Sequence, residues 1–469
     1  MPLSLLAALV AAPNVLFIAV DDMRVELGCY GQEQIVSPNL DRLAANGMRF
    51  DRAYCQQAVC NPSRASLLTG RYPHSLGVFD LHTHFRDRHP DAVTLPQAFK
   101  RAGYRTRCIG KIFHNWVQPQ RRGDRPSWSV PSVMHYFHHS DDVPHVGLVP
   151  PSLSDVPKTE RRDVPDEAYL DGRVAALAAE ALAAEADRDE PFFLAVGFWK
   201  PHSPFNAPDA YWRMYDRDAI EPPSPSQPPR DVPPLAMHNG RELMNGFRDR
   251  PGKRPTDGET LALRHGYYAA ISYVDAQIGR VLDALDESGQ RDETIVVFWS
   301  DHGYHLGEKT LWAKTSNFEL DARVPLLIDA PGLPAGSTDA LTELLDLYPT
   351  LCELCGVAPP DELEGESLVP TLRDPGVAGD AFALTMHPRP AYLADGEQPT
   401  TMGLSLRTRR YRYTEWRTFA DGAVTDEVVA QELYDHDADP DETVNLAGRD
   451  AMRETIERLA TELADAVDR

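Results

Sequence analysis

The sequence predicts an α/β fold: a large mixed, mostly parallel sheet sandwiched by helices, followed by a smaller C-terminal α+β subdomain. Several short runs are apolar at almost every residue, as in Asn14–Val20, which is typical of parallel strands covered on both faces. Segments with apolar residues at helical spacing lie between these runs. Strands that alternate with helices in this way indicate an open, mostly parallel sheet.

Individual elements follow from the same patterns. The expected strands of the main sheet are 14–20, 104–110, 192–198, 294–300 and 324–329. The expected helices are 168–187 and 260–287. The proline-rich stretch 219–234 predicts an extended, irregular surface loop, because the α/β pattern resumes after it.

The pattern changes near residue 375. Segments 404–408 and 411–416 alternate as half-buried antiparallel strands do, and 451–467 is a closing amphipathic helix. We therefore predict a main domain over 13–375 and a C-terminal subdomain over 376–469 that holds a small antiparallel sheet and a terminal helix.

Charge and composition exclude several classes of protein. The formal charge of −24 over 469 residues repels nucleic acid, so neither a nucleic-acid partner nor a phosphate-tracking surface is expected. No apolar run reaches the roughly 20 residues of a membrane span, so no membrane partner is expected. Residues 3–12 resemble the end of a secretory signal that lacks its basic region. This segment predicts a periplasmic or secreted protein, with the cytoplasm as the alternative.

Ionisable residues follow four of the five predicted strands. In chain order they are Asp21 and Asp22, then Lys111 and His114, then Lys200 and His202, and finally Asp301 and His302. Ligands of open α/β sheets bind beyond the carboxyl ends of parallel strands, so these groups are expected to converge on one site. In isolation, each aspartate could be a helix cap or a solvated loop residue, and each histidine a surface or core residue.

The densest motif is Cys60-Asn-Pro-Ser-Arg64. Asn61 is expected to cap a helix, and Pro62 suits its first turn. Cys60 would then lie at a helix N-terminus beside Arg64, where backbone N–H groups favour an anion. That environment predicts a depressed pKa and a reactive thiol.

The run from Cys60 to Arg71 resembles the signature of type I, formylglycine-dependent sulfatases of the alkaline phosphatase superfamily: Cys-x-Pro-x-Arg followed by Leu-Thr-Gly-Arg. Further segments resemble the iduronate 2-sulfatase branch; they are 20–24, 28–31, 56–60, 110–114, 193–202, 300–303, 312–318 and 407–413. The resemblance extends from Asn14 to about Tyr434. It implies an alkaline phosphatase-like fold and places the catalytic sulfatase domain at 13–375.

The resemblance implies a cofactor and a modification. In the family, a formylglycine-generating enzyme oxidises the cysteine, so Cys60 would be the precursor of the nucleophile. The implied ligands of a calcium ion are Asp21, Asp22, Asp301, His302 and the modified Cys60. Carboxylates suit a hard dication, and Mg²⁺ stays open as the metal. Imidazole suits softer metals, so His302 would be a weak ligand or a hydrogen-bond donor to the other ligands.

The resemblance also implies roles in catalysis. One hydroxyl of hydrated formylglycine attacks sulfur and the alcohol leaves; the second hydroxyl then loses its proton and sulfate is expelled. Arg64, Lys111 and Lys314 would stabilise the negative charge of the transition state. His202 matches the proton donor to the leaving alcohol, and His114 would lie near the hydroxyls of the nucleophile.

The leading hypothesis is therefore an exo-acting, calcium-dependent uronate 2-O-sulfatase acting on a sulfated carbohydrate, in the setting of glycosaminoglycan degradation. Three alternatives stay open: a sulfatase for another sulfated glycan or small sulfate ester, a phosphonate monoester or phosphodiester hydrolase, and an inactive glycan-binding homologue. Segments 119–165 and 304–305 depart from the iduronate branch where glycan subsites are expected. Arg407, Arg409 and Arg410 could reach a substrate carboxylate or be exposed strand charges.

Overall fold

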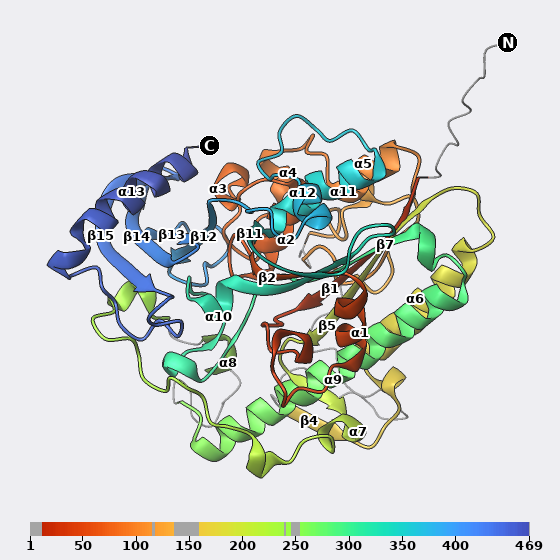
Figure 1. Cartoon of the computed structure of the whole chain (residues 1–469), viewed down its shortest axis with the longest axis horizontal. Coiled ribbons are helices and arrows are strands. Elements are labelled where there is room, and N and C mark those ends of the chain that lie inside the picture. Colours follow the sequence, from red (N-terminus) through yellow and green to blue (C-terminus); the bar gives the residue numbers. More distant parts are fainter. Residues whose placement is uncertain (1–11, 115–117, 136–158, 239–240, 245–253, 469) are drawn as a thin grey trace.

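A seven-stranded sheet forms the centre of the molecule in the computed structural model, which describes residues 12–114, 118–135, 159–238, 241–244 and 254–468 (Figure 1). The strand order is β11-β2-β10-β7-β1-β5-β3. The bounds are β1 Asn14–Asp21, β2 Met48–Tyr54, β3 Arg105–Gly110, β5 Phe192–Pro201, β7 Thr294–Ser300, β10 Arg323–Asp329 and β11 Gly336–Glu343. The predicted α/β architecture is confirmed, while β2 and β11 were not expected from the sequence.

Helices cover both faces of this sheet (Figure 1). On one face lie α1 (Pro38–Asn46), α6 (Leu170–Glu185) and α9 (Asp257–Glu287); on the other lie α2 (Cys60–Thr69), α5 (Leu95–Arg101) and α11 (Leu347–Cys355). Within β1, Phe17 belongs to one core and its neighbour Ile18 to the other. Because successive side chains of a strand point to opposite faces, an all-apolar strand is what two covered faces require.

Strand direction decides which strand ends meet. β1 runs parallel to β5 and β7, and β3 runs parallel to β5, so the carboxyl ends of these four strands share one edge. β10 runs antiparallel to both of its neighbours, β2 and β7. Its last residue, Asp329, therefore lies at the opposite edge from Asp21.

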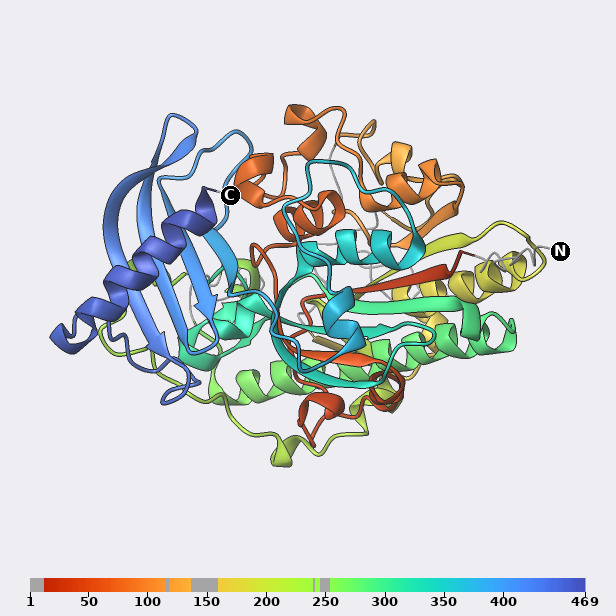
Figure 2. The same cartoon turned by 45° about the horizontal axis from the view of Figure 1, so that its top comes forward.

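The C-terminal residues form a separate antiparallel sheet, seen at the left of Figure 2. Its strands, in spatial order, are β12 Phe382–Arg389, β13 Thr401–Thr408, β14 Tyr411–Ala420 and β15 Ala423–Asp435. Helix α13 (Arg453–Val467) packs on this sheet through Leu459 and Leu463. The expected strands and closing helix of the subdomain are thus confirmed, and the boundary at 375/376 stays a prediction.

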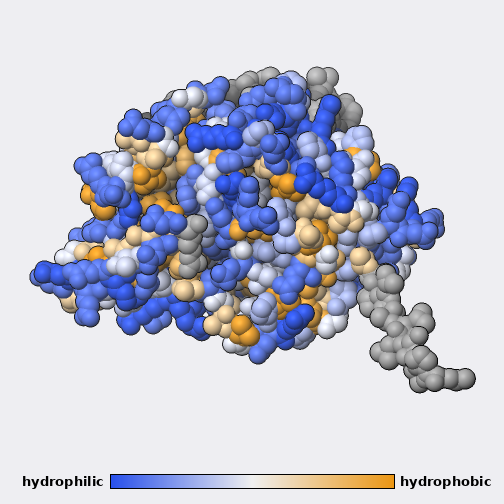
Figure 3. Space-filling view, turned by 90° about the horizontal axis from the view of Figure 1, so that it is seen from above, coloured by the Kyte–Doolittle hydropathy of each residue, from blue (hydrophilic) through white to orange (hydrophobic). Residues whose placement is uncertain are grey.

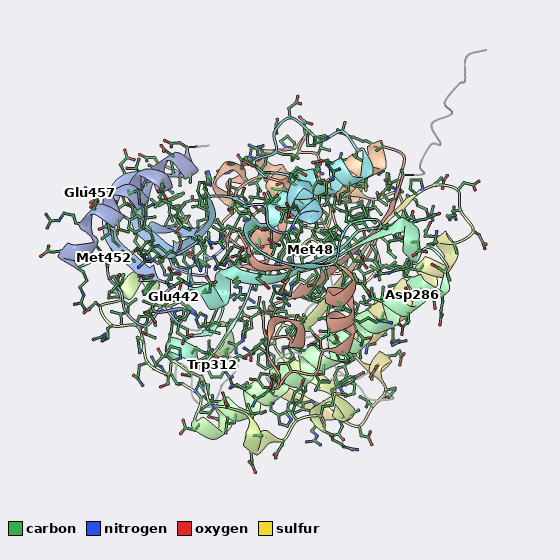
Figure 4. All side chains as sticks on the ribbon, viewed as in Figure 1. Met48, Asp286, Trp312, Glu442, Met452 and Glu457 are labelled. Carbon is green, nitrogen blue, oxygen red and sulfur yellow. The ribbon has the colours of Figure 1, made fainter. Side chains whose placement is uncertain are left out.

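Short elements complete the chain. The helices are α3 Pro73–Leu76, α4 Phe85–Arg88, α7 Asp209–Trp212, α8 Arg241–Met244, α10 Glu319–Ala322 and α12 Val369–Arg373. The strands are β4 Thr159–Arg162, β6 Phe205–Pro208, β8 His305–Leu306 and β9 Trp312–Ala313. In Figure 4, Met48 lies in the middle of the molecule, and it is almost fully buried.

The face drawn in Figure 3 is mainly polar and carries small separate apolar areas. Across the described ranges, no helix combines the length and apolarity that a bilayer span requires. The signal-like stretch 3–12 lies outside the described residues except for Ala12, and residues 136–158 of segment 119–165 lie outside them as well.

Gly197 tests the close approach of the backbones of β3 and β5. It pairs with Ala19 and Gly110, and an added Cβ would lie 1.9 Å from the carbonyl oxygen of Lys111. Gly197→Ala should lower the free energy of unfolding by about 1–3 kcal/mol, because the backbone of β3 must move away. Gly258→Ala is the control, since no atom lies within 4 Å of its added Cβ, and it should cost nothing or stabilise by up to about 1 kcal/mol. Denaturant titration measures both, and equal stability of the two variants would contradict the account.

Candidate active site

The carboxyl ends of β1 and β7 are joined by direct hydrogen bonds. The N–H of Asp22 donates to Asp301 Oδ1 at 3.2 Å, and the N–H of Met23 donates to Ser300 Oγ at 2.9 Å. Asp22 adopts a left-handed backbone conformation (φ 66°), which turns the chain sharply after the strand. The side chains of Asp21, Asp22 and Asp301 are fully buried.

Cys60 is the first residue of α2 and is 3% exposed. Its Sγ lies 3.4 Å from Asp21 Oδ1 and 3.4 Å from His302 Nε2. The expectation that Asn61 caps this helix is wrong. The N-cap is Val59, and the Asn61 amide instead donates to the carbonyl oxygens of residues 80 and 83, which fixes the neighbouring loop.

Arg64 is fully buried and forms hydrogen bonds to residues at the ends of several strands. Its guanidinium donates to Asp301 Oδ2 (2.8 Å) and to the carbonyl oxygens of Lys111 (2.7 Å), Ile112 (3.0 Å) and Val20 (3.1 Å). Four of the five N–H groups of the guanidinium therefore donate to buried polar groups, and Nη2 also lies 3.6 Å from Asp21 Oδ1.

Two cations orient two of the carboxylates. Lys111 Nζ donates to Asp21 Oδ2 at 2.5 Å, and Arg64 Nε donates to Asp301 Oδ2. In each case the cation holds Oδ2, while Oδ1 of Asp21 faces Cys60 Sγ. Outer partners of this kind fix the direction of a ligand oxygen.

The pKa of the Cys60 thiol is raised to about 12, chiefly by burial and by the Asp21 carboxylate, although Lys111 and Lys314 lower it. The expected depressed pKa is therefore wrong for the unmodified residue, because burial and the carboxylate outweigh the helix terminus and the cations. A thiol with this pKa is almost wholly protonated at neutral pH, so its chemistry as a thiolate is suppressed.

Lys314 and His202 approach from the other side of Asp22. Lys314 Nζ donates to Asp22 Oδ1 at 2.9 Å and Oδ2 at 3.1 Å. His202 Nε2 lies 3.6 Å from Asp22 Oδ2, and its Nδ1 lies 2.5 Å from the carbonyl oxygen of Ser203. Burial disfavours the ammonium of Lys314, yet Asp22 and Glu242 hold its pKa well above the ordinary value.

The predicted metal ligands come together. Four of them offer ligand atoms within 4.8 Å of one another: Asp21, Cys60, Asp301 and His302. Asp22 forms a second such group with Cys60 and His202. Carboxylate oxygens fit a hard dication such as Ca²⁺, whereas His302 and the unmodified sulfur of Cys60 depart from that preference.

The remaining predicted residues lie at varied distances from this centre. His114 is half-buried in the turn three residues after Lys111, and its role stays a prediction. Arg407 is buried and pairs with Glu319. Arg409 pairs with the exposed Asp339, and Arg410 pairs with the buried Asp435. For Arg407 the sequence left open a substrate contact or an exposed strand charge; the structure shows an internal ion pair.

Sequence reasoning missed three residues at this site. Glu242 accepts a hydrogen bond from Lys314 Nζ at 2.9 Å, and Tyr392 OH donates to Glu242 at 2.5 Å. Tyr304 is fully buried beside the same groups. Of the three, only Tyr304 could have been noticed in the sequence, because segment 304–305 departs from the iduronate branch close to Asp301.

Comparison with known proteins identifies the family. A family model described as Sulfatase matches residues 13–357, and a model described as N-sulphoglucosamine sulphohydrolase, C-terminal, matches residues 307–469.

The chain belongs to the sulfatase family. It is 34% identical to iduronate 2-sulfatase of Mus musculus over 92% of this chain and 90% of that protein. It is 33% identical to the Homo sapiens protein over 93% and 91%. Among solved structures, phosphonate monoester hydrolase from Silicibacter pomeroyi has a TM-score of 0.78 at 26% identity, covering 97% of this chain and 94% of that one. The predicted resemblance and fold class are confirmed, and the protein is a sulfuric ester hydrolase.

Metal binding gives the test of the cluster. Asp301→Asn should lower calcium affinity at least about tenfold, because one anionic ligand and the orienting pair with Arg64 are lost. Asp329→Asn is the matched control, since this aspartate also ends a strand but lies at the opposite edge of the sheet. Calorimetric titration of both variants with Ca²⁺ measures the difference, and the same affinity in Asp301→Asn as in the wild type would contradict the assignment.

Proposed function

We propose that the protein is an exo-acting uronate 2-O-sulfatase that uses formylglycine at Cys60 and a calcium ion on a terminal sulfated sugar. The observation that carries the proposal is the position of Cys60 at the focus of Asp21, Asp301 and His302. Its support beyond the site is the similarity to iduronate 2-sulfatase along almost the whole chain.

The balance of buried charge favours an anionic substrate. Three carboxylates, Asp21, Asp22 and Asp301, face three cations, which are Arg64, Lys111 and Lys314. A dication added to this set leaves an excess of two positive charges, or of one when the Glu242 carboxylate that contacts Lys314 is counted. A sulfate monoester brings one negative charge in the ground state and concentrates more on its oxygens as the ester bond breaks, so the site is complementary to the transition state.

When present, the dication supplies Lewis-acid polarisation of the sulfate and the hydrated formylglycine supplies the attacking hydroxyl. The chain's own residues do the rest. Lys111 and Arg64 hold the carboxylates in position, and Lys314 donates to a sulfate oxygen. His202 Nδ1–H donates a hydrogen bond to the carbonyl oxygen of Ser203, which leaves Nε2 to carry the proton for the leaving alcohol. His114 is assigned to the hydroxyls of the nucleophile.

A second candidate is hydrolysis of phosphonate monoesters or phosphodiesters, favoured by the similarity to the phosphonate monoester hydrolase. A sulfatase acting on another sulfated glycan or on a small sulfate ester is a third. An inactive glycan-binding role is disfavoured, because Cys60, Arg64, Asp22, Asp301 and His202 are all in place. Maturation by a formylglycine-generating enzyme and export from the cytoplasm belong to the same proposal.

Sulfate release from defined substrates tests the proposal. The protein would be co-expressed with a formylglycine-generating enzyme and incubated with sulfated mono- and disaccharides, with Cys60→Ala as the blank. We expect release confined to 2-O-sulfated uronate termini and absent from the blank. Release from other sulfated sugars alone would reject the uronate assignment, and hydrolysis of phosphonates or phosphodiesters with none of any sulfate ester would reject the sulfatase reaction.

His202 is tested through the leaving group. His202→Asn should lower kcat about 10²–10⁴-fold on a sugar sulfate, because an alkoxide cannot leave without a proton. On 4-nitrophenyl sulfate, whose phenolate leaves unprotonated, the loss should be much smaller. Steady-state kinetics on both esters, with the wild type as reference, measure the two losses. Equal losses would show that His202 does not protonate the leaving group.

A further inference from the structure

Three groups at the centre of the site are almost inaccessible to solvent. Cys60 is 3% exposed, Lys314 is 2% exposed, and Asp22 is fully buried. A sulfate ester therefore cannot reach them unless some side chain withdraws. Among the described residues, the half-buried Glu242 on α8 contacts both Lys314 and His202, so it lies between the catalytic groups and their surroundings.

Within the described part of the chain, Glu242 contacts polar groups on both of its carboxylate oxygens. Its Oε1 accepts from Lys314 Nζ at 2.9 Å and lies 3.4 Å from His202 Nε2. Its Oε2 accepts from Tyr392 OH at 2.5 Å. Lys314 and His202 belong to the main domain, whereas Tyr392 follows β12 of the C-terminal sheet, so one carboxylate connects the two.

We propose that Glu242 is a carboxylate latch: in the substrate-free enzyme it occupies Lys314 and His202 in place of the sulfate ester, and the substrate must displace it. The inference rests on the proposed function, in which Lys314 donates to a sulfate oxygen and His202 to the leaving oxygen. A carboxylate and a sulfate ester both present anionic oxygens, so the same two donors cannot serve both at once.

The hydroxyl of Tyr304 is an independent observation that points to a ligand. It is fully buried, and no hydrogen-bond partner for it exists among the described residues. A buried donor without an acceptor is costly, and an incoming oxygen beside Lys314 would give it one.

The opposite role for Glu242 makes the opposite prediction. If its carboxylate bound a hydroxyl of the leaving sugar, removing its charge would weaken binding of the substrate. Binding of inorganic sulfate would not change, since sulfate has no such hydroxyl. If it is a latch, removing its charge frees two donors for any tetrahedral oxyanion that fits the site. Inorganic sulfate therefore separates the two roles.

The test is calorimetric titration of the calcium-loaded protein with inorganic sulfate. Glu242→Gln keeps the shape of the side chain and removes the charge, and it should bind sulfate at least about fivefold more tightly than the wild type. Tyr392→Phe removes the donor that anchors Glu242 Oε2 and should shift sulfate binding in the same direction. Glu221→Gln removes an exposed carboxylate outside these contacts and should bind as the wild type does.

Unchanged or weaker sulfate binding in Glu242→Gln, in a variant that melts at the same temperature as the wild type, would overturn the latch. Tyr392→Phe decides the question if Glu242→Gln does not fold. Because the readout is binding, it is separate from turnover. Tighter sulfate binding without sulfate release from any ester would retain the latch and reject the proposed substrate, whereas normal release with unchanged binding would reject the latch alone.

Discussion

Burial of three carboxylates at one edge of the sheet is the constraint on which the rest of the site depends. Asp21, Asp22 and Asp301 have no access to water, and unpaired charges in such a place would cost several kcal/mol each. Three cations pair with these carboxylates: Arg64 from α2, Lys111 from the end of β3 and Lys314 from the segment after β9. Elements from distant parts of the sequence are therefore bound to one another through the same charges that are assigned to catalysis.

The same constraint explains why access is controlled by polar contacts. Cys60 is only 3% exposed, and the element next to Lys314 carries a carboxylate of its own, Glu242. That carboxylate satisfies Lys314 in the absence of substrate, at the cost of competing with it. Tyr392 donates to the same carboxylate from the C-terminal subdomain, so that subdomain contributes a residue to the surroundings of the site.

The sequence predicted the parts of the site that follow from parallel strands, since Asp21 and Asp301 come directly after apolar runs and Lys111 comes after a weaker strand pattern. It did not predict β2 or β11, whose burial alternates or is partial, nor the antiparallel direction of β10, because direction is set by pairing partners far along the chain. The predicted low pKa of Cys60 failed because the motif displays nearby cations but not the depth of burial. Glu242 was missed because no motif surrounds it and only tertiary packing brings it to Lys314.

The central claim is that these buried charges form one site for a dication and a sulfate group together. The most direct test is the affinity for inorganic sulfate measured with saturating Ca²⁺ and again after removal of the metal by a chelator. The account predicts that Ca²⁺ strengthens sulfate binding and that sulfate strengthens Ca²⁺ binding by the same factor, as linkage requires. Sulfate binding that is unchanged when the metal is removed would contradict it.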